Sequence, residues 1–191
     1  MTRQQFNDML LKVAKESKSK LVIIGSQAFF ASTQSDDIPE IVSISDEIDL
    51  LPENSSEAES IGDKFGEESK YFREYGKYVH ALDNSERHIL TEGWKARLIP
   101  YKIKDGKKGK EYEVYCLSLL DICVNKLCWG REKDYRFISN VISDGHISME
   151  EIESLSGSVK ENFRKMVSKN IENAKEFIQQ SEESNPISQS E

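Results

Sequence analysis

The sequence predicts an α+β fold, with a small mixed sheet in the first two thirds of the chain and helices in the last third. Two observations support this division. Before residue 117, short runs rich in β-branched and aromatic residues, such as KLVIIG at 20–25, are separated by polar turns. After residue 117, apolar residues recur every three or four positions, the spacing of amphipathic helices. We therefore expect an α/β core over 1–116, a helical part packed on it over 117–180, and a disordered polar tail over 181–191.

The N-terminal third is expected to alternate helices and strands. Residues 3–17 carry the apolar spacing of an amphipathic helix, and the run at 20–25 reads as a buried strand that stops at Gly25. Helical character resumes with Ser26 as its N-cap. A polar loop then leads to a second strand at 47–51.

The remaining elements follow in order. Residues 53–69 indicate an acidic helix interrupted near Gly62 or Gly66, and the runs at 77–82 and 96–103 are strand candidates. The lysine- and glycine-rich turn that follows predicts a hairpin to a last strand. Several helical segments then end in a long helix at 158–180, whose apolar stripe would cover the sheet or contact a partner.

The composition indicates a cytoplasmic protein. The net charge is −8, with 26 basic and 34 acidic residues, which argues against a surface that coats DNA or binds membranes. No export signal is evident, and no run reaches the ~20 apolar residues of a membrane-spanning helix. The cysteines, which lack the spacing of a zinc site, are expected to be reduced core residues, and the scattered histidines are expected to be structural or on the surface. These residues are Cys116, Cys123 and Cys128, and His80, His88 and His146.

Two short stretches carry candidate chemistry. In IIGSQAFF, Gly25 lets the backbone approach a ligand, and the helix that opens at Ser26 directs free N–H groups outward, which outlines a phosphate cradle. In SDEIDLLP, Glu47 and Asp49 are two positions apart on a strand, so both point to one face while Ile48 points to the core. Two adjacent carboxylates repel unless a cation lies between them, which suggests a divalent metal ion. Alone, either stretch could equally be a solvated surface.

Together, IIGSQAFFA and SDEIDLLP resemble the signature of the nucleotidyltransferase superfamily that includes DNA polymerase beta and minimal bacterial nucleotidyltransferases. The stretches LTEGWKARLIP, YCLSLLDICVNKLCWGREKDYRFI and ISDGHIS are similar to an uncharacterised bacterial branch of it. The late segment is also similar to the abortive-infection nucleotidyltransferase toxins. The resemblance spans residues 20–155 and implies a nucleotidyltransferase-type sheet, an NTP substrate and Mg²⁺ or Mn²⁺.

The resemblance also implies roles for individual residues. Glu47 and Asp49 would bind the catalytic metal, and Lys126 would approach the phosphates as a third catalytic residue. Nucleotide binding falls to Gly25 and Ser26, which would hold the triphosphate, and to Arg131, Lys133 and Asp134, which would complete a basic wall. From the residues alone, the charges at 131–134 could instead pair with one another on a solvated face.

Two further residues match the branch. Trp94 could stack on a base and Arg97 could contact a phosphate, or they could plug the sheet edge and form a surface pair.

The chain departs from the superfamily pattern at three points. Position 47 is Glu where Asp is usual, and Ser26 lies 21 positions before Glu47, farther than in compact members. The superfamily normally adds a third carboxylate from a later strand, as a base for the attacking hydroxyl. Only Asp83 is a candidate for it here.

These features favour an enzyme that transfers a nucleoside monophosphate from an NTP to a hydroxyl on RNA, such as tRNA, or on a protein, with a toxin-like role. The alternative is a non-catalytic nucleotide- or RNA-binding module, or a toxin–antitoxin partner that keeps the fold. An antitoxin or a second copy of the chain could then be its partner.

Overall fold

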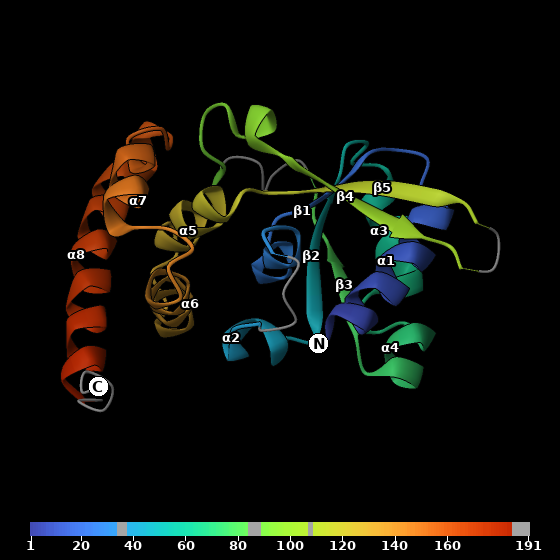
Figure 1. Cartoon of the computed structure of the whole chain (residues 1–191). Coiled ribbons are helices and arrows are strands. Elements are labelled where there is room, and N and C mark those ends of the chain that lie inside the picture. The colour runs from blue at the N-terminus through green and yellow to red at the C-terminus, as the bar shows by residue number, and fades with distance from the viewer. Residues whose placement is uncertain (34–37, 84–88, 107–108, 185–191) are drawn as a thin grey trace.

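The computed structural model describes residues 1–33, 38–83, 89–106 and 109–184. A five-stranded mixed sheet is flanked by helices and followed by a helical C-terminal part (Figure 1). The predicted α+β fold class is confirmed. His88 lies outside the described residues.

The sheet has the strand order β3-β2-β1-β5-β4. Its strands are β1 (Leu21–Ile23), β2 (Glu47–Pro52), β3 (Tyr78–Ala81), β4 (Ile99–Lys104) and β5 (Glu111–Cys116). Strand β1 pairs antiparallel with β2 and parallel with β5, and β2 pairs parallel with β3. Strands β4 and β5 form the predicted antiparallel hairpin. The short apolar strand β1 therefore lies at the centre of the sheet.

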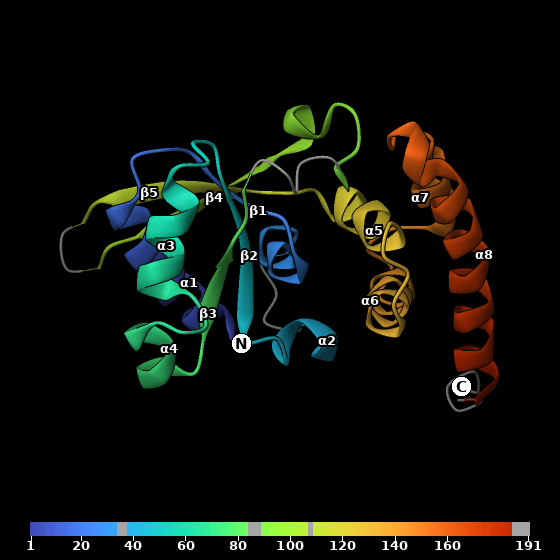
Figure 2. The same ribbon diagram turned by 180° about the vertical axis from the view of Figure 1, so that it is seen from behind.

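Helices cover both sides of this sheet. They are α1 (Arg3–Glu16), η1 (Ser26–Ala31), α2 (Glu40–Ser43), α3 (Glu57–Phe65), α4 (Lys70–Tyr75), η3 (Trp94–Arg97), α5 (Leu119–Leu127), α6 (Glu132–Ser143), α7 (Met149–Ser156) and α8 (Glu161–Ser184). Figures 1 and 2 show α1, α3 and α4 on one side of the sheet, with η1, α2 and the C-terminal helices on the other. No helix among the described residues is both long and apolar enough to cross a membrane.

Several local expectations are corrected. Ser26 is not an N-cap, because Gly25 takes that position and the segment forms the 3₁₀ helix η1. Of the two interruptions expected in the acidic helix, the one near Gly66 is confirmed and the one near Gly62 is not, because α3 runs through Gly62, ends at Phe65 with Gly66 as its C-cap, and is followed by a separate helix, α4. Helix α2 replaces the end of the expected polar loop. Residues 96–97 belong to η3 and not to a strand.

The long C-terminal helix α8 packs against α5, α6 and α7, not against the sheet. Its buried residues include Val167, Ile171 and Ala174. The helix extends to Ser184, four residues beyond the predicted end at 180, and residues 185–191 lie outside the described part. Most of its apolar stripe is therefore covered within the chain, although Met166 remains 40% exposed.

Candidate active site

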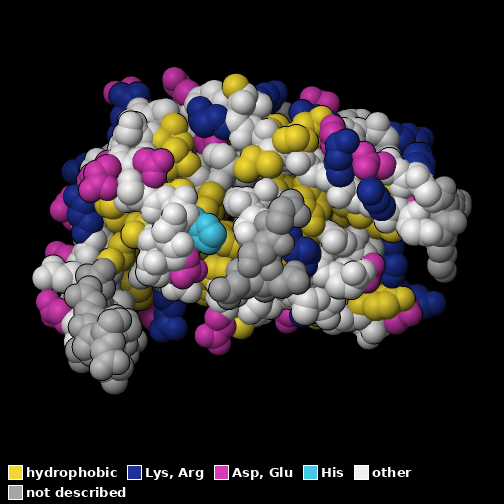
Figure 3. Space-filling view, in the orientation of Figure 1, with side chains coloured by type: hydrophobic (Ala, Val, Ile, Leu, Met, Phe, Trp, Pro, Cys, Tyr) yellow, Lys and Arg dark blue, Asp and Glu magenta, His cyan; other side chains and the backbone are white. Residues whose placement is uncertain are grey.

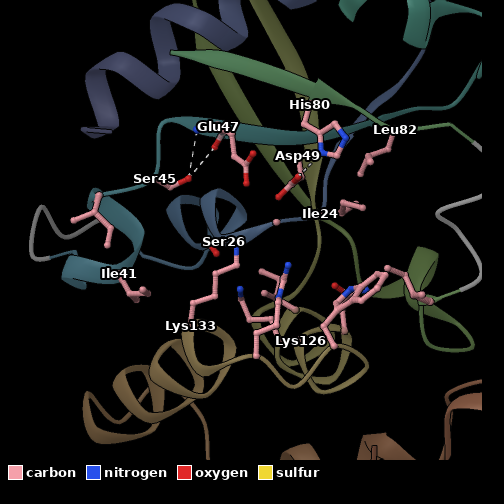
Figure 4. A pocket seen from close by; sticks show the side chains of 17 residues that line it. Ile24, Ser26, Ile41, Ser45, Glu47, Asp49, His80, Leu82, Lys126 and Lys133 are labelled. Carbon is pink, nitrogen blue, oxygen red and sulfur yellow. Dashed lines mark hydrogen bonds and ion pairs between the residues drawn. The ribbon is translucent and has the colours of Figure 1, made fainter. Parts of the chain in front are cut away.

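A cleft of about 500 Å³ is lined by residues of the sheet side and of the C-terminal helices. Figure 4 shows Glu47, Asp49 and His80 on the sheet side, with Lys126 and Lys133 facing them from the helices. The described residues that line it are Ile24, Gly25, Ser26, Ile41, Ile44, Ser45, Glu47, Asp49, His80, Leu82, Ile89, Ile122, Asn125, Lys126, Trp129, Arg131 and Lys133. One cleft thus joins both sequence stretches with most of the late basic segment.

The two acids are carried by β2 as the strand alternation predicts. Glu47 and Asp49 line the cleft and are partly exposed, while Ile48 between them is fully buried. Tyr78 on β3 lies opposite Glu47, and its phenol donates a 2.7 Å hydrogen bond to Glu47 Oε2. Burial, followed by the bond to Glu47, raises the pKa of Tyr78, so the phenol stays a donor at neutral pH. This hydrogen bond fixes the side chain of Glu47, which is longer than the Asp that is usual at this position in the superfamily.

Gly25 is required by the position of Asp49. A Cβ at residue 25 would overlap the Asp49 carboxylate, so any larger residue would displace that side chain. The backbone also joins the two segments, because Ile24 N donates to Asp49 O at 3.0 Å. Ser26 begins η1 and lines the same cleft.

His80 is the site residue that sequence reasoning missed. It lies opposite Asp49 in the parallel pairing of β2 with β3, and its Nδ1 is 3.2 Å from Asp49 Oδ1. Ligand atoms of Glu47, Asp49 and His80 all lie within 4.8 Å of one another. Two carboxylates and an imidazole that converge in this way fit a divalent metal ion. The sequence signal was the position of His80 in a short strand, which becomes informative only once that strand is paired with β2.

The opposite wall of the cleft is basic. Lys126 comes from α5, whereas Arg131 and Lys133 lie at the start of α6. The Lys126 side chain is only 11% exposed, and its Nζ lies 3.2 Å from Asp134 Oδ1. Burial lowers the pKa of Lys126, and the charge of Asp134 partly offsets that effect. The lysine is therefore held in place and not left to move freely in solvent.

Asp134 lies behind the basic wall and does not line the cleft. Its side chain is fully buried, and its Oδ2 accepts a 2.7 Å bond from Arg131 Nε in addition to the Lys126 contact. Burial alone would raise the pKa of Asp134, but the bond from Arg131 and the two cationic charges outweigh it and leave the pKa below its ordinary value. Asp134 therefore orients both cations.

The segment between α5 and α6 is anchored by α8. Asn170 donates from Nδ2 to Leu127 O at 2.8 Å, and Gly130 packs against the same amide with a φ of +61°. A side chain at residue 130 would both clash with Asn170 and strain the backbone. Between these anchored points, Trp129 is 50% exposed and lines the cleft.

The other residues considered from the sequence lie elsewhere. Trp94 borders a separate small hollow with Lys20 and Leu98 and packs against the core. Arg97 donates from Nε to Oδ2 of the buried Asp121 at 2.9 Å. Neither residue lines the main cleft, and Arg97 pairs with a buried acid and not in the expected surface pair.

Asp83, the candidate third carboxylate, is exposed and borders a different shallow hollow. Among the described residues that line the main cleft, Glu47 and Asp49 are the only acids.

A comparison with models of known protein families agrees with this geometry. No curated protein and no solved structure matches the chain. A family model described as "Nucleotidyltransferase of unknown function (DUF6036)" matches residues 3–184, which is nearly the whole chain. The match includes both walls of the cleft, so the chain belongs to this family of nucleotidyltransferases.

Proposed function

We propose that the protein is a metal-dependent enzyme that transfers a nucleoside monophosphate from an NTP to a hydroxyl group on RNA, such as tRNA, or on a protein. The observation that carries this proposal is the pairing of two walls in one cleft. Glu47, Asp49 and His80 converge on the sheet side, and Lys126, Arg131 and Lys133 face them from the helices. A nucleoside triphosphate with its metal ion carries a positive charge that the acidic wall would bind and negative charges that the basic wall would bind.

The sheet side would hold the metal ion, Mg²⁺ or Mn²⁺, through the two carboxylates and the imidazole. When bound, such an ion polarises the phosphate and neutralises charge that develops during the transfer. Gly25 leaves room for the Asp49 carboxylate at this wall, and Ser26 offers its hydroxyl and backbone N–H to the phosphates.

The helical side would bind the triphosphate. Lys126, held by Asp134, and the more exposed Arg131 and Lys133 supply three positive charges to oxygens of the phosphate chain. The acceptor oxygen forms a bond to the α-phosphorus as the bond to the β-phosphate oxygen breaks. Pyrophosphate leaves, and the hydroxyl proton is released to water.

The similarity of the late segment to toxin nucleotidyltransferases supports tRNA or a protein as the acceptor. It also supports action in the cytoplasm as a toxin. On the face in Figure 3, acidic and basic side chains are interspersed, without a broad patch of positive charge. Because the chain also has a net charge of −8, an RNA acceptor would be bound near the basic wall of the cleft and not over an extended surface.

The second candidate is a nucleotide- or RNA-binding module without turnover, which could serve as a toxin–antitoxin partner. One observation favours it. Among the described residues that line the cleft, no third carboxylate accompanies Glu47 and Asp49 to act as base for the acceptor hydroxyl.

Label transfer tests the proposal. The protein would be incubated with each α-labelled NTP, Mg²⁺ or Mn²⁺, total RNA and cell lysate, beside Asp49→Asn and the control Asp83→Asn. We expect label on an RNA or protein band with wild type and Asp83→Asn, and none with Asp49→Asn. Metal-dependent NTP binding without transfer would favour the second candidate. NTP binding that Asp49→Asn leaves unchanged would contradict a metal site at Glu47 and Asp49, and with it the proposed transfer.

A further inference from the structure

One large apolar side chain in the cleft is not used by the proposed chemistry. Trp129 is 50% exposed, although the other described tryptophan, Trp94, is packed against the core. The Arg131 guanidinium lies 5.8 Å from the Trp129 ring centroid, so one side of the indole is next to the basic wall. An exposed indole in a cleft that also contains phosphate-binding cations resembles a surface on which a flat ring stacks.

The neighbours of Trp129 extend this surface. Asn125 and Lys126 lie three and four residues after Ile122 and four and three residues before Trp129, which places all four along one face of α5 and its continuation, and all four line the cleft. Leu82 and Ile89 line the same cleft. Apolar side chains therefore lie beside Lys126, next to the place where the triphosphate would bind.

Asn125 supplies an independent indication of a ligand. Its Nδ2 is buried and has no hydrogen-bond partner among the described residues. A buried amide donor without a partner is costly, so a ligand or water normally satisfies it. On this wall the amide lies one residue from Lys126 and four from Trp129.

We propose that the nucleobase of the NTP stacks on Trp129 and accepts a hydrogen bond from the Asn125 amide, while its triphosphate contacts Lys126, Arg131 and Lys133. This inference rests on the proposed function, since it names the subsite that would hold the nucleoside. Stacking provides affinity for the base that inorganic phosphates lack. The subsite therefore separates an NTP from tripolyphosphate of the same charge.

The test compares those two ligands. In a Trp94→Phe background Trp129 is the sole tryptophan, so its fluorescence reports the subsite directly. With Mg²⁺ present, NTPs should quench this fluorescence, and tripolyphosphate should bind without quenching. By calorimetry, Trp129→Ala should weaken NTP binding roughly five- to a hundredfold, the range of base–aromatic stacking, with tripolyphosphate affinity unchanged. Trp129→Phe should retain part of the NTP affinity. Asn125→Ala should weaken NTP binding and leave tripolyphosphate binding unchanged.

Trp94→Ala is the matched control and should bind NTPs as wild type does. If Trp129→Ala also binds NTPs with wild-type affinity, the stacking subsite is wrong and the proposed function survives. If wild type binds neither NTPs nor tripolyphosphate, the proposed function fails together with the subsite.

Discussion

His80 would give the proposed metal site an unusual ligand set. The resemblance implies a third carboxylate from a strand after β2, whereas β3 directs an imidazole at Glu47 and Asp49. Imidazole nitrogen is an ordinary ligand for first-row transition metals, while Mg²⁺ prefers oxygen. We therefore expect the protein to bind Mn²⁺ more tightly than Mg²⁺. His80→Ala should weaken Mn²⁺ binding at least about tenfold, because even an outer-shell contact is worth that much.

Electron paramagnetic resonance of Mn²⁺, with Mg²⁺ as competitor, measures this preference directly. His80→Asp should restore an all-oxygen set and let Mg²⁺ compete better than it does in wild type. Asp83→Asn, a change outside the main cleft, should alter neither affinity. Unchanged Mn²⁺ binding in His80→Ala would show that the imidazole is not a ligand.

At the scale of single residues, the sequence was enough to identify site residues whose placement depends only on their neighbours along the chain. Strand alternation was enough to place Glu47 and Asp49 on one face with Ile48 behind them. His80 could not be found in this way, because its role depends on the pairing of β3 with β2, 31 residues earlier. Trp129 likewise follows the end of α5, which Asn170, far along the chain, anchors by its bond to Leu127 O.

At the scale of elements, Asp134 joins α5 to the start of α6. It is fully buried between Lys126 of one helix and Arg131 at the N-cap of the other. Removal of one partner from a buried ion pair typically costs 3–5 kcal/mol, so Asp134→Asn should lower the free energy of unfolding by about that amount. Urea denaturation measures the loss. Glu132→Gln, which breaks an exposed pair with Arg136 in the same helix, should cost no more than about 0.5 kcal/mol.

The pH dependence follows from the same contacts. The Asp134 pKa is depressed in the folded protein, so its contribution is complete above the ordinary carboxyl value near 4 and is lost as pH falls through the lower folded value. Between about pH 5 and pH 2, wild type should therefore lose more stability than Asp134→Asn. Parallel profiles for the two proteins would mean that the pKa of Asp134 is the same in the folded and unfolded states, so that its buried contacts do not depress it.

Elements with a strong periodic pattern were predictable, and short ones were not. The paired strands and the long C-terminal helices carry their own apolar spacing. Helix α4 depends on caps, with Ser69 accepting from Phe72 N and Gly76 in the left-handed region, and this signal was present in the sequence but weak. Helix α2 has four residues, and the Gln27 amide from η1 donates to its Val42 O at 2.8 Å. Such a helix depends on tertiary contacts that no local pattern encodes.

At the scale of the whole molecule, the cleft divides the structure between a sheet half and a helical half. Glu47, Asp49 and His80 belong to the sheet, and Lys126, Arg131 and Lys133 belong to α5 and α6. A metal–nucleotide complex that contacts both walls would link the halves and bind only the folded chain. Binding should therefore stabilise the protein against heat.

At a hundredfold excess over the dissociation constant, a ligand of this kind should raise Tm by about 5–10 °C for a chain of this length. Thermal melts would be followed by circular dichroism with NTP and Mn²⁺ together, with each alone, and with EDTA. The full rise should require both components, because metal alone contacts the sheet side and nucleotide alone meets the repulsion of Glu47 and Asp49. Asp49→Asn should lose most of the joint effect. An equal rise in that variant, or in EDTA, would show that the nucleotide binds without the acidic wall, and the two-walled cleft would then not be the binding site.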